Sequence, residues 1–194
     1  ILGFSELMQM GTFGDLNEKQ TEATHQIIES VHFLSGLVND LLDEAQISAQ
    51  KMVVRLDNFL LAEVLARVEH SMAILAANKK LLFTLTRAPD VPEYVIGDEG
   101  RIQQILVNLT GNAIKYTRTG NVSVEIFCPD SDHWGMRISD SGVGIPAEYL
   151  ATIFEPFRQV NQQTRSLARG VGLGLTITKQ LVELMGGKIL VESE

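Results

Sequence analysis

The first fifty positions carry apolar residues at helical spacing. Residues 1–10 predict a short apolar helix, the glycine-containing run 11–15 predicts a turn, and a second helix is expected over residues 16–49. The apolar positions of the second helix alternate at spacings of four and three, namely Ile27, Val31, Leu34, Val38, Leu41 and Ala45. This heptad pattern favours a four-helix bundle formed by two chains, which would bury the apolar stripe. A hairpin packed on its own domain is the alternative.

Beyond residue 51 the pattern changes to a mixture of short strands and helices. Strands are predicted over residues 53–56, 81–86, 121–127, 134–139 and 188–191. Helices are predicted over residues 58–77, with Asn58 as the N-cap, over 99–116, from Pro146, and over 173–185, where Gly186 and Gly187 end the helix. Strands and helices in mixed order predict one sheet with helices packed on it. The expected fold class is α+β: a helical hairpin in residues 1–50, then an α/β sandwich in residues 51–194.

Composition narrows the class of protein. Hydrophobic residues make up 45% and charged residues 21%, which fits a folded globular protein. The net charge of −8 argues against a nucleic-acid partner or a broad membrane-binding surface. A single cysteine, Cys128, excludes an internal disulfide and a multi-cysteine metal site. No apolar run approaches the ~18 residues of a membrane-spanning helix. We expect a cytoplasmic location; both ends look cut, so membrane anchoring of a longer parent protein stays open.

The predicted helix over residues 99–116 carries the first candidate chemistry. Asn108, Asn112 and Lys115 are four and then three residues apart, so they share one helical face. Two amides and one ammonium on a single face suit a hydrated Mg²⁺ with the phosphates of a substrate, because Mg²⁺ keeps waters and binds substrate oxygens. Taken alone, this segment is explained better by a helix with a solvated polar face.

Two glycine-containing segments add to this site. Asp140 follows an apolar strand and precedes Gly142 and Gly144, so a carboxylate can accept a hydrogen bond from an exocyclic amine while the glycines admit a flat ring. Gly170, Gly172 and Gly174 precede a helix, where backbone N–H groups favour phosphate. The polar run 158–169 suits a lid over a nucleotide. A tight turn and a flexible surface loop are the respective alternatives.

Together these segments resemble the catalytic domain of sensor histidine kinases, within the GHKL superfamily of ATP-binding domains. The resemblance rests on an asparagine box at residues 108–117, a first glycine box at 140–144, a phenylalanine box at 154–157, and a second glycine box at 170–175. Four boxes in the family's order are far more specific than any one of them. The resemblance covers residues 51–194, and the N-terminal hairpin resembles the family's dimerisation domain.

The resemblance implies a role for each matching residue. Asp140 would bind the adenine amine in a pocket shaped by Gly142 and Gly144, and Tyr116 would flank the base. Asn112, helped by Asn108, would hold Mg²⁺, and Lys115 would reach phosphate. The lid would be anchored by the phenylalanine box and would close on ATP through the second glycine box, with these residues: Phe154, Phe157, Gly170, Gly172, Leu173 and Gly174. Arg169 and Val171 stand where glycine and threonine are more usual in this family.

The implied activity is transfer of the γ-phosphoryl group of ATP to a histidine, for relay to an aspartate in a response-regulator receiver domain. Related gyrase-type ATPases place a water-activating glutamate where this chain has Asn108, and an amide is no general base. In this family the acceptor histidine lies upstream of a segment like residues 1–7, so we expect it to be missing from this chain. The final strands of the family follow a segment like residues 191–193, so we expect these strands to be missing as well. The remaining histidines are interpreted as surface or structural residues: His25, His32, His70 and His133.

Two other functions stay open. A pseudokinase would dimerise and bind ATP only to signal, and the intact ATP-site residues weigh against it. A serine kinase of the anti-sigma type would share the ATP site, but a heptad hairpin joined directly to that domain argues against this reading.

Overall fold

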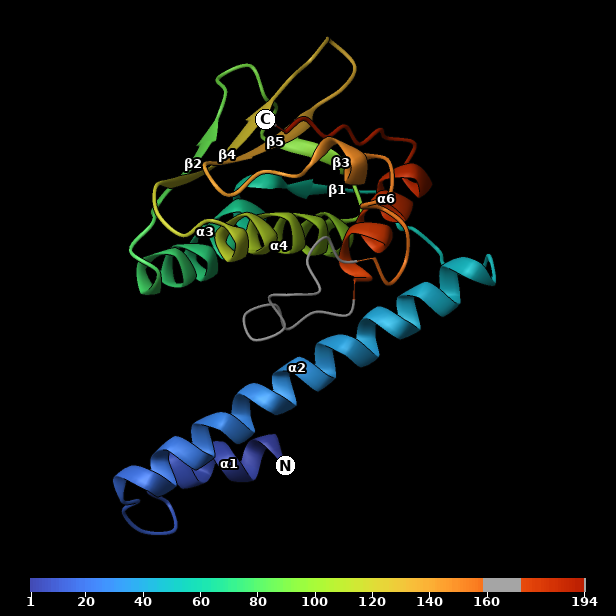
Figure 1. The fold of residues 1–194 in the computed structure, drawn as a ribbon. Helices are drawn as coiled ribbons and strands as arrows, with labels where there is room; N and C mark the ends of the chain where they lie inside the picture. The colour runs from blue at the N-terminus through green and yellow to red at the C-terminus, as the bar shows by residue number, and fades with distance from the viewer. Residues whose placement is uncertain (159–171, 194) are drawn as a thin grey trace.

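The N-terminal part of the computed structural model, which describes residues 1–158 and 172–193, is a helical hairpin. Helix α1 spans Leu2–Gln9 and lies beside the first turns of α2, which spans Glu18–Ser48 (Figure 1). A capping box begins α2: the Gln20 N–H donates to Asn17 Oδ1 at 3.0 Å, and the Asn17 N–H donates to Gln20 Oε1 at 2.9 Å. Both predicted helices are confirmed to within two residues at each end.

The heptad seam of α2 is largely uncovered in the described part of the chain. Ile27, Leu34, Val38 and Leu41 are each more than 40% exposed. Among the described residues, the C-terminal end of α2 contacts the second domain, where Ile47 packs against residues of α6 (Gly174–Leu184). Packing of the hairpin on its own domain therefore leaves most of the seam in contact with solvent.

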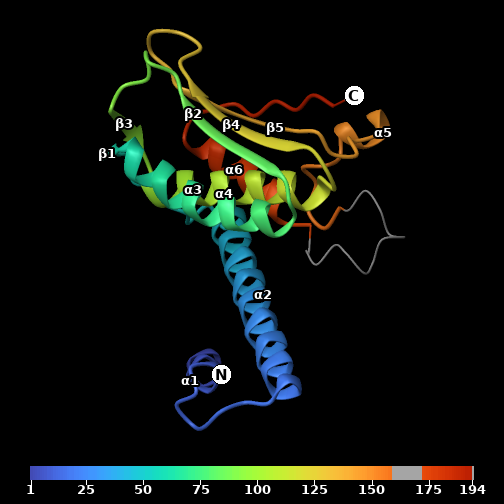
Figure 2. The same ribbon diagram turned by 90° about the vertical axis from the view of Figure 1, so that its left-hand side faces the viewer.

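The second domain has two sheets and a layer of helices. Strands β1 (Asp57–Leu60) and β3 (Tyr94–Gly97) pair antiparallel. Strands β2 (Leu82–Arg87), β4 (Asn121–Phe127) and β5 (Gly135–Asp140) form a sheet of order β2-β4-β5. In that sheet β2 is parallel to β4, and β5 is antiparallel to it. Helices α3 (Leu61–Asn78), α4 (Glu99–Tyr116) and α6 cover one face, and the short α5 (Ala147–Leu150) lies near the end of β5 (Figure 2). The predicted mixed fold class is confirmed.

The main hydrophobic core is built on the alternating burial of residues along β4, the central strand. Val122, Val124 and Ile126 of β4 are fully buried, and the residues between them are partly exposed. These three pack against α3 and α4, whose Val64 and Leu106 are also fully buried. A second, smaller cluster is formed by Ile105, Leu173, Ile177 and Leu181, and Ile47 and Met52 of the hairpin and linker pack against it.

Three sequence predictions about strands were wrong. The strand expected over residues 53–56 begins instead at Asp57, because Phe59 is the buried residue and pairs with Val95; Asn58 therefore lies in β1, and Leu60 precedes α3. Strand β3 was missed, since its four residues lie between Pro92 and the N-cap Asp98 of α4. Residues 188–191 are not a strand, because they share no backbone ladder with a neighbour.

The end of α3 carries a lysine in a conformation suited to glycine. Lys80 has φ +59°, and the Leu81 N–H donates to the Ala76 carbonyl at 3.0 Å while the Lys80 N–H donates to the Ala77 carbonyl at 2.9 Å. This is a Schellman motif, in which the left-handed residue is usually glycine. We expect Lys80→Gly to raise the free energy of unfolding by about 0.5–1 kcal/mol. Glycine relieves the strain of the left-handed backbone, and this gain exceeds the entropy that glycine loses on folding. Urea denaturation measures this, and Asn78→Gly, inside the helix, should lower the same quantity.

Candidate functional site

Asp140 lies at the end of β5, beside the end of α4. Its Oδ1 accepts the Gly142 N–H at 2.8 Å and faces the Thr117 hydroxyl, which donates at 3.4 Å. A Cβ on residue 142 would stand 2.6 Å from Asp140 Oδ1 and 3.0 Å from the Tyr116 carbonyl oxygen, so only glycine fits between the two segments. The first glycine box and the end of the asparagine box thus meet at one exposed carboxylate.

The polar face of α4 meets the beginning of α6. The Asn108 side-chain amide donates to Thr178 Oγ1 at 2.7 Å. A Cβ on residue 174 would stand 2.4 Å from Asn108 Oδ1, so the first turn of α6 approaches this asparagine closely. Asn112 and Lys115 follow on the next two turns of α4, and the Lys115 ammonium lies 5.1 Å from the centroid of the Tyr116 ring.

The phenylalanine box lies against the end of the second glycine box. The Phe157 N–H donates to the Gly172 carbonyl at 3.0 Å, and the Phe157 side chain is 63% exposed. The Lys179 ammonium lies 5.7 Å from the centroid of the Phe154 ring. Leu173 is buried in the smaller core cluster, and Gly144 has a φ of +67°. Gly170, with Arg169 and Val171, lies outside the described residues.

These groups fit a magnesium nucleotide. Amide oxygens such as those of Asn108 and Asn112 are ligands that Mg²⁺ accepts, and two of them leave most coordination positions to water and phosphate. Among the described residues no group of three or more His, Cys, Asp or Glu side chains is placed to hold a metal by itself. The beginning of α6, beside Asn108, is the positive end of a helix dipole, which favours an anion.

Sequence reasoning missed two of the hydroxyls at this site. Thr117 is fully buried at the end of α4 and faces Asp140, although it was recognised only as the last residue of a box. Thr178, 2% exposed, orients Asn108 from α6. Their sequence signal is a threonine directly after α4 and a threonine within α6, and neither position by itself indicates more than packing. By contrast, His25, His32, His70 and His133 are all exposed, as predicted.

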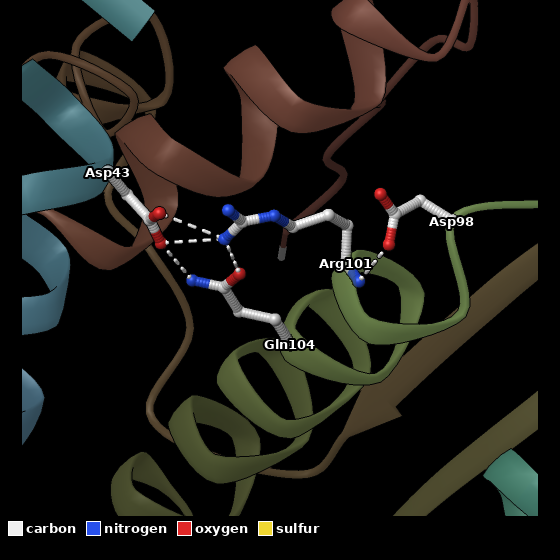
Figure 3. Close-up of polar contacts among 4 residues, drawn as sticks. All are labelled: Asp43, Asp98, Arg101 and Gln104. Atoms are coloured by element: carbon white, nitrogen blue, oxygen red, sulfur yellow. Dashed lines mark hydrogen bonds and ion pairs between the residues drawn. The ribbon is translucent and has the colours of Figure 1, made fainter. Parts of the chain in front are cut away.

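A polar junction ties the hairpin to the nucleotide domain (Figure 3). Asp43 of α2 is 8% exposed, and its two oxygens accept Arg101 Nη1 of α4 at 2.9 and 3.0 Å. Gln104 completes the cluster by donating to Asp43 at 2.8 Å and accepting from Arg101 at 2.8 Å. Asp98 caps α4 by accepting the Arg101 N–H at 3.1 Å. The first turns of α4 are therefore fixed to α2.

One turn before the junction, Asp40 should respond to pH. Burial and the neighbouring Asp43 raise the pKa of this carboxyl above its usual range. The folded state therefore binds the proton of Asp40 more tightly than the unfolded state does. The resulting stabilisation is fully present below the pKa of the unfolded state and is lost as the pH rises through the pKa of the folded state. We expect Asp40→Asn to raise the thermal unfolding midpoint at pH 7, and to raise it less near pH 4. An equal rise at both pH values would contradict this.

Comparison with known proteins identifies the family. Residues 97–194 match the family model described as histidine kinase-, DNA gyrase B-, and HSP90-like ATPase, which is half of the chain. The chain belongs to this ATPase family. The resemblance to the catalytic domain of sensor histidine kinases, drawn from the four boxes, is confirmed by relatives that carry that name.

Similar curated proteins carry the name of signal transduction histidine kinases. The chain is 35% identical over 204 residues to hybrid signal transduction histidine kinase A of Dictyostelium discoideum, covering 100% of the chain and 9% of that protein. It is 34% identical over 198 residues to the signal transduction histidine-protein kinase BarA of Escherichia coli, covering 100% of the chain and 21% of BarA. The chain thus spans 9% of one of these curated relatives and 21% of the other.

Two solved structures share the fold over nearly the whole chain. The full-length structure of ShkA in complex with AMPPNP matches with a TM-score of 0.75 and 30% identity, over 96% of this chain and 38% of ShkA. The Acinetobacter baumannii histidine kinase AdeS matches with a TM-score of 0.72 over 100% of this chain and 87% of AdeS; at 23% identity it shows the fold alone. No helix in the described ranges, 1–158 and 172–193, is long and apolar enough to cross a membrane.

Proposed function

We propose that this chain is the catalytic core of a sensor histidine kinase: it binds Mg-ATP and delivers the γ-phosphoryl group to a histidine. The observation that carries the proposal is the convergence of Asp140, the Asn108–Lys115 face of α4 and the beginning of α6. Asp140 would accept the adenine amine, with Tyr116 flanking the base. Asn108 and Asn112 would hold Mg²⁺, which neutralises charge on the phosphates, and Lys115 would bind a phosphate oxygen. The lid would close through Phe157, Leu173 and the glycines at 170, 172 and 174.

Transfer is favoured over hydrolysis by what stands at position 108. Asn108 donates its amide to Thr178 and has no proton-accepting nitrogen, so it cannot activate water as a carboxylate would. The contribution of the protein is then to orient the nucleotide and to balance its charge. The proposed acceptor is a histidine other than the four in this chain, because His25 and His32 of the hairpin lack the sequence context of the family's acceptor.

The proposal includes two partners. A second copy of the chain would cover the heptad seam, because Leu34 at 58% exposed and Val38 at 45% exposed form a stripe suited to knobs-into-holes packing. A response-regulator receiver domain would take the phosphoryl group onto an aspartate. A pseudokinase remains the second candidate function, and retention of the complete set of nucleotide-site residues speaks against it.

Incubation with γ-labelled ATP tests the transfer step. A longer form of the protein that includes the segment preceding residue 1 should gain label that is lost in acid and kept in alkali, as a phosphohistidine is. The 194-residue chain alone should gain none. Asn112→Ala in the longer form should abolish labelling. Release of inorganic phosphate without labelling of the protein would favour an ATPase, and absence of both would favour the pseudokinase.

A further inference from the structure

Lys79 connects the end of α3 to the end of α4. Its ammonium donates to the Ile114 carbonyl at 2.8 Å and to the Lys115 carbonyl at 2.7 Å. These two carbonyls belong to the last turn of α4, where carbonyl groups lack helical partners and the helix dipole places negative charge. One cation from a neighbouring helix therefore satisfies two acceptors at the end of α4.

The fold holds Lys79 in position. It is the C-cap of α3, and its own N–H donates to the Ala76 carbonyl. The Schellman motif at Lys80 then turns the chain, so that Leu81 is 7% exposed and enters the core before β2 begins. Helices α3 and α4 lie side by side in both views (Figures 1 and 2). The aliphatic part of the Lys79 side chain therefore extends from a fixed backbone position next to α4.

The carbonyls that Lys79 binds stand immediately before the residues around Asp140. The Tyr116 carbonyl oxygen lies next to Gly142, because a Cβ on residue 142 would be 3.0 Å from it. The Thr117 N–H closes the helix by donating to the Ala113 carbonyl at 3.0 Å, and its hydroxyl donates to Asp140. A shift of the last turn of α4 would therefore move both groups that face the first glycine box.

We propose that Lys79 is a positioning residue for the base-binding end of the nucleotide site: by holding the Ile114 and Lys115 carbonyls, it sets Tyr116 and Thr117 against Asp140 and Gly142. The proposal rests on the proposed function, since it assigns Asp140 to the adenine. It makes Lys79 matter more for the base than for the phosphates, because Lys115 is the one proposed phosphate ligand in the anchored turn, whereas Asn112 and the beginning of α6 lie outside it.

The test compares Lys79→Met, which removes the donors and keeps the stem, with Lys79→Arg, whose guanidinium can still donate to carbonyls. Lys51→Met is the matched control, because it makes the same chemical change at an exposed lysine between the two domains. Each protein is titrated with Mg-AMPPNP and, separately, with Mg-triphosphate, which has no base. Amide hydrogen exchange at Thr117 is followed in the absence of any ligand.

We expect Lys79→Met to lose on the order of tenfold in AMPPNP affinity, the effect of losing hydrogen bonds to a charged group. Its triphosphate affinity should fall by less than its AMPPNP affinity, because Lys115 is the one proposed phosphate ligand in the anchored turn, and Thr117 should exchange faster. Lys79→Arg and Lys51→Met should behave like the wild type. Unchanged AMPPNP affinity in a folded Lys79→Met protein would overturn the proposal, as would an equal loss for both ligands, which indicates a merely structural role.

The two proposals can fail separately. A wild-type chain that bound neither ligand would refute the proposed function. Thr117 exchange would then decide the role of Lys79 alone: faster exchange in Lys79→Met, but not in Lys79→Arg, supports the anchoring of α4, and unchanged exchange refutes it.

Discussion

Replacing Asp140 with asparagine is expected to lower the affinity of the chain for Mg-AMPPNP by about tenfold to a hundredfold, the range for a hydrogen bond to a charged group. The carboxylate accepts from Gly142 and from Thr117, and it is exposed at the end of β5, where a ligand amine can reach it. An asparagine keeps the shape but offers a single acceptor oxygen, and its NH₂ group would face the donors. Isothermal titration calorimetry measures the change.

A matched control is Asp132→Asn, in the turn between β4 and β5. Its backbone N–H donates to Asp130, and its side chain is exposed, so the same chemical change there should leave nucleotide affinity unaltered. Equal affinities for wild type and Asp140→Asn would remove Asp140 from the adenine site.

Breaking the junction between hairpin and nucleotide domain is expected to have the second large effect. Asp43→Ala leaves Arg101 and Gln104 partly buried without their acceptor, and Arg101 has a side chain only 26% exposed. Loss of one partner of such a pair costs about 3 kcal/mol. Because the pair joins α2 to α4, we expect this loss to free the nucleotide domain from its fixed orientation on the hairpin.

Spin labels can report that orientation. Spin-labelled cysteines are introduced at the exposed His32 of α2 and His70 of α3, in a Cys128→Ser background. Double electron–electron resonance should give a narrow distribution of the distance between the labels, and a broad one after Asp43→Ala. The charge-reversed variants Asp43→Arg and Arg101→Asp should each broaden it, and their combination should narrow it again. A narrow distribution in every variant would mean that apolar packing of Ile47 and Met52 suffices.

The parts of the fold with strong periodicity were predictable. The helix over residues 99–116 and the strand over 121–127 have the predicted bounds, because apolar residues repeat along both and a cap or turn marks each end. Strand β1 was placed four residues too early, because Val53 and Val54 are stronger strand formers than the segment that contains Phe59. Only its pairing with β3 decides where the strand lies.

The candidate site could be assembled from the sequence where its residues share one element or one motif. Asn108, Asn112 and Lys115 follow from helical spacing, and Asp140 follows from its place after a strand. The junction was not predictable, because Asp43 and Arg101 are 58 residues apart and each resembles an ordinary surface charge. The same holds for Lys79, whose partners are backbone carbonyls 35 and 36 residues away and leave no mark in the sequence.

The most direct test of the account is a two-dimensional ¹H–¹⁵N spectrum of the chain titrated with Mg-AMPPNP. We predict saturable shifts of the amides around Asp140 and Gly142, of Asn112 to Thr117 at the end of α4, and of Gly174 at the beginning of α6. Saturable binding with shifts confined to another surface, or no binding by a folded chain, would contradict the claim that these residues form a nucleotide site.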